Sequence, residues 1–182
     1  MFKEVLKKIA NKFNEEKIPY LVIGGQALLI YGEPRFTRDI DIIVGVLPRD
    51  FDKILGLTKK IGLEPLTEDA RKFVEETYVL PLEDSKTKIR VDLIFSFSTF
   101  ESMAIARGVN KEIEGVIIKF ASIEDLIIFK MFSGRGRDID DVKSLVRLNR
   151  KIDIDYIIKW LKEFDRELGT DMEDKFKLIS NL

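Results

Sequence analysis

The sequence contains neither cysteine nor histidine. This absence excludes disulfides, zinc sites made from those residues, and nucleophilic schemes that pair serine or cysteine with histidine. The ionisable chemistry that remains belongs to carboxylates, lysine, arginine and tyrosine. Because carboxylate oxygens prefer hard cations, a metal in this protein is expected to be Mg²⁺ or Mn²⁺.

The sequence also lacks a strong net charge and any apolar run long enough to cross a membrane. With a formal net charge of −1, no broad basic field attracts nucleic acid, which would need a local patch. The first residues are MFKEVLKKIANKFNEE, amphipathic with charges of both signs and unlike a secretory signal. A cytoplasmic protein without membrane association is expected. The 35% of charged residues, with no cysteine, is typical of a thermophilic source.

What is present favours a globular chain with one main core. A chain of 182 residues, 45% of them hydrophobic, can bury such a core and carry a small helical extension. No repeat, low-complexity segment or flexible linker interrupts it. A boundary near Ser122 divides an α/β core, residues 1–121, from a helical region, residues 122–182, which is expected to pack on the core.

Hydrophobic periodicity predicts an α/β (α+β) fold, a mixed and mostly antiparallel sheet flanked by helices. Expected helices cover Phe2–Lys17, Pro48–Ile61, Thr99–Arg107, a segment opening at Ser122, Asp138–Leu148, Ile152–Leu168 and Thr170–Asn181. Expected strands cover Tyr20–Ile23, Asp39–Val44, Glu76–Leu82, Lys86–Phe97 and a hairpin over Val109–Phe120. The segment Glu83–Ser85 is the expected turn between the third and fourth of these strands.

The stretch Val22–Val44 carries the main chemical signal. A short apolar strand stops at Gly24 and Gly25, a short helix follows, and a second strand places Asp39 and Asp41 on one face. Two neighbouring carboxylates repel unless water or a cation separates them, and a divalent cation that also binds phosphates meets that need. Glycines let the backbone approach a phosphate at the start of a helix. Taken alone, the glycine pair could be an ordinary tight turn, and the two aspartates could lie on an ordinary solvated strand face. Their order and spacing together favour a metal and phosphate site.

This order resembles the signature of the DNA polymerase beta-type nucleotidyltransferase superfamily. The signature is a glycine pair, here Gly24-Gly25, followed after a helix by Arg35-Phe36-Thr37-Arg38-Asp39-Ile40-Asp41. The form R-x-T-x-D-I-D resembles small bacterial and archaeal proteins related to AbiEii/AbiGii-type toxins and to minimal nucleotidyltransferases. Two features depart from the pattern, because Gly-Gly stands where Gly-Ser is common and the chain is shorter than typical toxins of this type.

The resemblance implies three catalytic and metal-binding carboxylates, which are Asp39, Asp41 and Asp92. The third would come from a strand well downstream, and the segment R-V-D-L-I around Asp92 matches that form. An alternative interpretation makes Asp92 a solvated strand residue paired with Arg38 or Arg90. The metal would be Mg²⁺ or Mn²⁺.

The resemblance also implies residues that bind the nucleotide phosphates, through the glycine backbone, a hydroxyl and positive side chains. These are Gly24, Gly25, Arg35, Thr37, Arg38, Lys130, Arg135 and Arg137. An alternative interpretation of Lys130, Arg135 and Arg137 is a basic loop followed by an ordinary helix, with no role in substrate binding. The resemblance makes an acid of this region a candidate base, but Asp138 and Asp141 are expected to be structural acids at the start of that helix.

The implied activity is the transfer of a nucleoside monophosphate from an NTP to a hydroxyl acceptor with two metal ions. The acceptor could be an RNA end, a protein or a small molecule, and the sequence does not specify which. Two other functions stay open: a non-catalytic interaction or regulatory protein of the toxin-antitoxin type that retains the fold, and a hydrolase that uses the same metal scheme. Homodimerisation or a partner toxin or antitoxin protein would use the amphipathic C-terminal helices.

Overall fold

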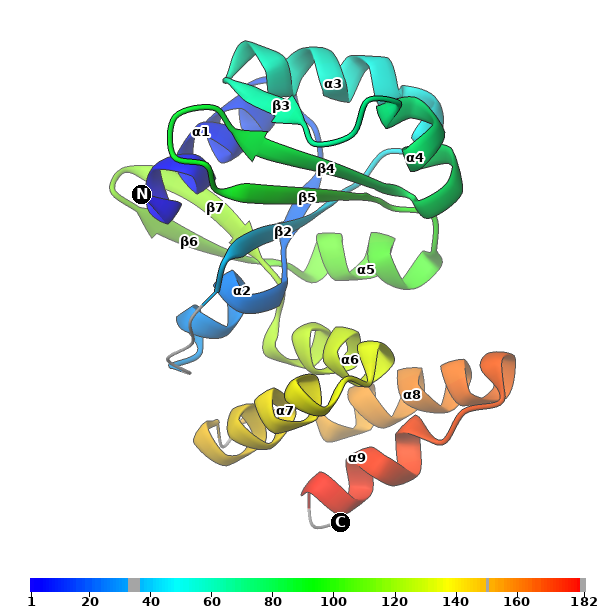
Figure 1. The fold of residues 1–182 in the computed structure, drawn as a ribbon. Helices are drawn as coiled ribbons and strands as arrows, with labels where there is room; N and C mark the ends of the chain where they lie inside the picture. The colour runs from blue at the N-terminus through cyan, green and yellow to red at the C-terminus, as the bar shows by residue number, and fades with distance from the viewer. Residues whose placement is uncertain (33–36, 150, 181–182) are drawn as a thin grey trace. The chain divides into compact units, whose positions relative to one another are not determined.

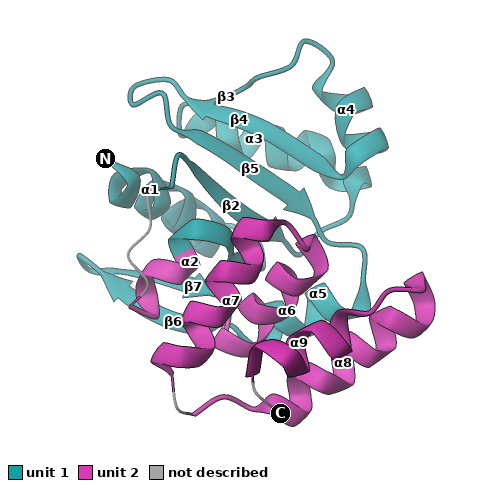
Figure 2. Ribbon diagram, turned by 60° about the horizontal axis from the view of Figure 1, so that its bottom comes forward, with its two compact units in different colours: residues 1–26, 36–121 teal, residues 27–35, 122–182 magenta. Residues whose placement is uncertain are grey.

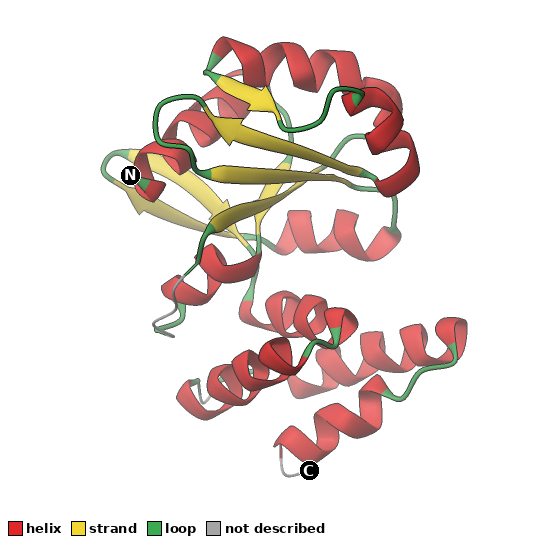
Figure 3. Ribbon diagram, in the orientation of Figure 1, coloured by secondary structure: helices red, strands yellow, loops and turns green. Residues whose placement is uncertain are grey.

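The structure is a computed structural model that describes residues 1–32, 37–149 and 151–180. Within these residues, one sheet contains seven strands in the order β3-β4-β5-β2-β1-β7-β6 (Figures 1 and 3). The strands are β1 (Tyr20–Val22), β2 (Asp39–Val44), β3 (Leu63–Pro65), β4 (Val79–Asp84), β5 (Arg90–Phe95), β6 (Val109–Ile113) and β7 (Val116–Phe120). Neighbours are antiparallel except β2 with β5 and β1 with β7, which are parallel. The predicted mixed, mostly antiparallel sheet is confirmed.

The chain divides into two compact units (Figure 2). The first, residues 1–26 and 36–121, contains the sheet, and the second, residues 27–35 and 122–182, is helical. Helices of the first unit are α1 (Phe2–Glu15), the 3-10 helix η1 (Pro48–Asp50), α3 (Phe51–Lys60), α4 (Ala70–Thr77) and α5 (Thr99–Arg107). Those of the second are α6 (Ile123–Ser133), α7 (Gly136–Leu148), α8 (Ile154–Leu168) and α9 (Met172–Ser180), while α2 (Gly24–Ile30) begins in the first unit and ends in the second. The predicted packing of residues 122–182 on the core stays a prediction.

The core of the first unit follows from side-chain periodicity. On β2 the alternate residues Ile40, Ile42 and Val44 have no exposed surface, as a half-buried strand requires. The α1 residues Val5, Leu6, Ile9, Ala10 and Phe13 are buried on one side of the helix, at the spacing of an amphipathic helix. The ring of Phe13 lies 5.7 Å from that of Tyr20 on β1, so the helix packs where the sheet begins. Among the described helices, none combines the length and apolarity that crossing a bilayer requires.

The connection between β4 and β5 differs from the prediction. The helix α4 extends to Thr77 and ends with Tyr78 in the left-handed region at φ 60°, so β4 starts at Val79 rather than at Glu76. The strand β4 continues through Asp84, and β5 starts at Arg90 rather than at Lys86. The turn therefore covers residues 85–87 and shares only Ser85 with the predicted Glu83–Ser85 segment.

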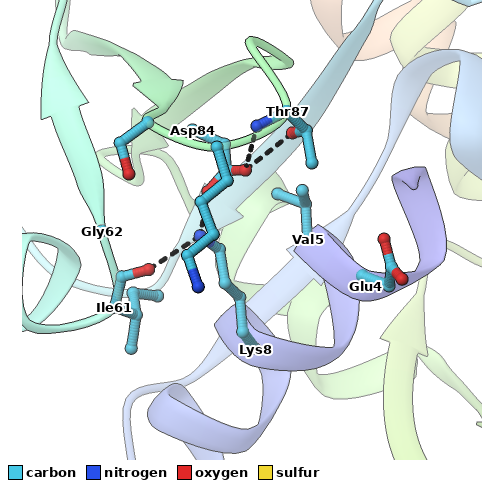
Figure 4. Close-up of a pocket in the computed structure, with 9 residues that line it drawn as sticks. Glu4, Val5, Lys8, Ile61, Gly62, Asp84 and Thr87 are labelled. Atoms are coloured by element: carbon cyan, nitrogen blue, oxygen red, sulfur yellow. Dashed lines mark hydrogen bonds and ion pairs between the residues drawn. The ribbon is translucent and has the colours of Figure 1, made fainter.

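A buried carboxylate explains this turn (Figure 4). Asp84 is 2% exposed, and its Oδ2 accepts hydrogen bonds from Thr87 N at 2.9 Å and Thr87 Oγ1 at 2.7 Å. Its Oδ1 pairs with Lys8 Nζ from α1, which also donates to the Ile61 carbonyl at 2.7 Å. These groups line a cavity of about 420 Å³. The pair of Asp84 and Lys8 thus ties together α1, the end of α3 and the β4–β5 connection.

In the second unit, the predicted helix start at Ser122 is confirmed. Ser122 Oγ accepts from Asp125 N at 3.1 Å and donates to the Asp125 carboxylate at 2.7 Å. Tyr156 Oη on α8 donates to the other Asp125 oxygen at 2.8 Å. A buried acid at the helix N-terminus therefore also joins α6 to α8.

Candidate active site

Three carboxylates converge where β2 lies beside β5. The two strands are parallel, and their register places Asp41 opposite Asp92 and Asp39 opposite Arg90. One carboxylate oxygen from each of Asp39, Asp41 and Asp92 lies within 4.8 Å of the others. All three residues are half-buried. The structure thus brings together the three acids that the sequence analysis identified.

The alternation along β2 fixes which face carries the acids. A one-residue change of register would turn Asp39 and Asp41 into the core and expose Ile40 and Ile42, which have no exposed surface. The buried Val91 and Leu93 on β5 similarly hold Asp92 on the acidic face, since side chains alternate along a strand. Burial of apolar side chains elsewhere on both strands therefore positions the carboxylates.

The glycine pair lies directly against this site. Gly24 has φ +61°, and a Cβ built on it would overlap Asp41 Oδ2 and lie 2.9 Å from Asp41 Cγ. A Cβ on Gly25 would overlap Thr37 Cγ2 and lie 2.9 Å from Thr37 Cβ. The backbone N–H of Ile23 donates to the carbonyl of Asp41 at 3.0 Å, which fixes this close approach. Both glycines are needed here because no side chain fits.

Gln26 is a site residue that the sequence analysis missed. It is 6% exposed, and its Nε2 donates to Thr37 Oγ1 at 2.7 Å. The amide therefore orients the threonine hydroxyl beside Gly25. The available signal was a polar residue in the apolar run that follows the glycine pair.

Among the described residues, Arg90 brings a basic group into contact with Asp92. Its Nε donates to Asp92 Oδ1 at 2.9 Å and to Asp92 Oδ2 at 3.0 Å. The hydrogen bond that Arg90 donates to Asp92 raises the pKa of Arg90 most; desolvation opposes the rise, and the charges of Asp92, Asp39 and Asp41 add to it. The alternative pairing of Asp92 with Arg90 is thus present, and it coexists with the carboxylate cluster.

The structure describes only some of the other residues that are expected to contact phosphates near the glycine pair. Arg38 is exposed and directly precedes β2, and Thr37 is half-buried next to Gly25. Arg35 lies outside the described residues. The phosphate contacts expected of these side chains stay predictions.

The second unit contains Lys130, Arg135 and Arg137. Lys130 is 6% exposed and its Nζ lies 2.8 Å from an oxygen of Asp138 and 2.8 Å from an oxygen of Asp141. Arg135 Nε lies 2.7 Å from the other Asp138 oxygen, while Arg137 is exposed. Burial alone would raise the pKa of Asp138, but hydrogen bonds led by that from Lys130 lower it to about 2. These ion pairs join α6 to α7, and phosphate binding by the three basic residues stays a prediction.

Comparisons with known proteins agree with this geometry. The family model described as "Nucleotidyltransferase of unknown function (DUF6036)" matches residues 1–179. No curated protein matches the chain. The predicted resemblance to the nucleotidyltransferase superfamily is confirmed, and the narrower relation to AbiEii/AbiGii-type toxins stays a prediction.

Solved structures show the same fold. An antigenic nucleotidyltransferase-like protein from Paracoccidioides brasiliensis is 20% identical, with 96% of this chain and 91% of that chain covered and a TM-score of 0.57. ANT(2")-Ia, solved with adenylyl-2"-tobramycin, is 16% identical over 96% of each chain, with a TM-score of 0.56. The lincosamide antibiotic adenylyltransferase LnuA, solved with lincomycin bound, is 17% identical over 78% of this chain and 94% of its own, with a TM-score of 0.54.

Proposed function

Because the chain belongs to the family of nucleotidyltransferases of unknown function, we propose that it is a metal-dependent enzyme that moves a nucleoside monophosphate from an NTP to a hydroxyl acceptor. The observation that carries the proposal is the convergence of Asp39, Asp41 and Asp92 on one face of the sheet. The close approach of the Gly24 backbone to Asp41 supports it, since it leaves the backbone beside the acids without a side chain.

The donor set fits a hard divalent cation. All three candidate ligands are carboxylates, and their oxygens lie within 4.8 Å of one another, a spacing that one cation can bridge. We propose that Asp39, Asp41 and Asp92 hold Mg²⁺ or Mn²⁺. When bound, such a cation neutralises triphosphate charge and lowers the pKa of an acceptor hydroxyl.

The chain's own groups would bind and orient the substrates. The backbone at Gly24 and Gly25 would approach the triphosphate, and the Thr37 hydroxyl, oriented by Gln26, would donate to it. In the transfer, the acceptor oxygen bonds to the α-phosphorus and the bond to the β-phosphate oxygen breaks. Pyrophosphate leaves, and Asp92 would take the acceptor proton.

Basic residues would offset the charge of the triphosphate. Arg35 and Arg38 precede the acidic strand and are proposed to act there. We extend the same proposal to Lys130, Arg135 and Arg137, for which the family resemblance implies phosphate binding. The acceptor class, an RNA end, a protein or a small molecule, is what the enzyme assay must identify.

The first test is calorimetric titration of each of the four NTPs, with and without Mg²⁺. The parent is expected to bind one or more of them only when Mg²⁺ is present. Asp39→Asn combined with Asp41→Asn should fold and lose this binding. The matched control is Asp140→Asn combined with Asp174→Asn, which removes the same charge from side chains that are 74% and 82% exposed.

Mg²⁺-dependent NTP binding by the Asp39→Asn, Asp41→Asn variant would contradict the proposal. If that variant binds Mg·NTP as well as the parent does, the three carboxylates are not the metal site. If the parent binds no NTP, a non-catalytic interaction protein becomes the better interpretation. Where binding is found, release of pyrophosphate with attachment of the nucleotide to an acceptor separates transfer from hydrolysis.

A further inference from the structure

Arg90 lies on the same sheet face as the three carboxylates and pairs with Asp92. It begins β5 directly opposite Asp39, and it precedes Asp92 by two residues, so all three side chains lie on one face of the sheet. A strand face with three carboxylates at this spacing is destabilised by their mutual repulsion. The guanidinium is the positive group that the register places among them.

The contact between Arg90 and Asp92 is specific. Arg90 Nε donates to both Asp92 oxygens, at 2.9 and 3.0 Å. The Asp92 side chain is 15% exposed, whereas that of Arg90 is 54% exposed. The carboxylate is thus held in the sheet while the guanidinium reaches it from the solvent side, which leaves the arginine able to move away at little cost in packing.

The same oxygens are the ones proposed to bind the metal. A guanidinium that contacts both oxygens of Asp92 shields the lone pairs that a cation would use, and its charge repels a divalent ion. The cluster of Asp39, Asp41 and Asp92 with Arg90 carries a net charge of about −2 when all four are ionised. Arg90 therefore stabilises the cluster without metal and opposes the entry of free metal.

Resting on the function proposed above, we infer that Arg90 is the resident counter-ion of the metal site, which it keeps from filling with free divalent cation. Metal then enters together with the nucleotide, because the triphosphate supplies the ligands and the negative charge that Arg90 offsets. Once the metal holds Asp92, the guanidinium is available to the phosphates. Arg90 is on this account a positioning residue that couples metal binding to nucleotide binding.

The test uses Mn²⁺ alone as the probe, with free Mn²⁺ measured by electron paramagnetic resonance. Arg90→Met should bind Mn²⁺ about tenfold more tightly than the parent, the effect of removing one positive charge about 6 Å from a divalent ion in water. Arg90→Lys keeps the charge and should stay within about threefold of the parent. Lys88→Met is the matched control, because Lys88 is 69% exposed and its ion pair is with Glu83.

A second readout does not depend on activity or on tight binding. Without metal, Arg90→Met should melt at a lower temperature than the parent, and added Mn²⁺ should raise its melting temperature more than it raises the parent's. Equal Mn²⁺ affinity and equal melting of Arg90→Met and the parent would overturn the counter-ion role. Absence of Mn²⁺ binding in both proteins would also overturn it.

These results are separable from failure of the proposed function. If the parent binds Mg·NTP and the Asp39→Asn, Asp41→Asn variant does not, the proposed metal site stands whatever Arg90→Met does. If instead Arg90→Met and Lys88→Met tighten Mn²⁺ binding equally, the effect is general charge and the role assigned to Arg90 is wrong.

Discussion

Replacement of Gly24 by alanine tests the close approach of the backbone to the acidic strand. Gly24 has φ +61°, where an alanine costs about 1 kcal/mol. The new methyl group would also overlap the Asp41 carboxylate, and forcing atoms into a filled space costs about 1–3 kcal/mol more. The total expected loss in the free energy of unfolding is therefore about 2–4 kcal/mol.

Gly115→Ala separates the two costs. Gly115 also has a positive φ, +80°, but a Cβ there meets nothing within 4 Å, so this variant should lose only about 1 kcal/mol. Both losses are measured by urea denaturation of metal-free protein, from the midpoint and slope followed by circular dichroism. The extra loss in Gly24→Ala is the part caused by Asp41.

A double-mutant cycle completes the test. In an Asp41→Ala background most of the overlap is gone, so Gly24→Ala should cost about as much as Gly115→Ala. The expected coupling between Gly24 and Asp41 is about 1–3 kcal/mol. If Gly24→Ala costs no more than Gly115→Ala, or if the two changes at Gly24 and Asp41 are additive, the contact does not exist and the geometry of the site is wrong.

Two further predictions concern the buried ion pairs. Lys8→Met should lower the free energy of unfolding by about 2 kcal/mol at neutral pH, since it leaves the buried Asp84 with only the donors of Thr87. Burial raises the pKa of Asp84, but hydrogen bonds from Lys8 and Thr87 lower it by more, so the net pKa is below its ordinary value. The difference in the free energy of unfolding between the parent and Lys8→Met should therefore be present above about pH 4 and shrink below it. Denaturation of both proteins across pH checks this, and a constant difference down to pH 2 would contradict it. For Asp138, whose pKa falls to about 2, Asp138→Asn should cost about 2 kcal/mol at pH 7, and the cost should disappear between about pH 4 and pH 2; a cost that rises as the pH falls would refute the pairing with Lys130.

Local patterns were enough to predict much of the first unit. The strand Asp39–Val44 and the helix Thr99–Arg107 were predicted at their observed bounds. The strand has strict alternation, and the helix opens with a capping box in which Ser98 Oγ accepts from Glu101 N and Glu101 accepts from Ser98 N. In both cases the determining contacts lie within a few residues of each other.

Where the prediction failed, distant contacts decide the structure. The β4–β5 connection depends on Lys8 reaching Asp84 from the N-terminal helix, and nothing near Asp84 in sequence announces this. The edge strand Leu63–Pro65 is too short to show a pattern and exists because it pairs with β4. Neither interaction can be read from a sequence window.

The candidate site divides in the same way. Asp39 and Asp41 share a face by local alternation, but the position of Asp92 opposite Asp41 is a matter of strand register. Asp92 was predicted through the resemblance to a family. The contact between Gln26 and Thr37 was not predicted, because no local pattern relates two residues that lie 11 positions apart in the sequence.

The parallel pairing of β2 with β5 has a consequence for folding. Between these strands the chain forms η1, α3, β3, α4 and β4, and in the sheet β5 lies between β4 and β2. The three carboxylates that we propose as metal ligands therefore meet only after a non-local, slow pairing has formed, and a chain synthesised only up to β4 contains two of the three, Asp39 and Asp41. On the proposed function, a divalent cation would stabilise the protein by binding the finished sheet, after β5 has paired with β2.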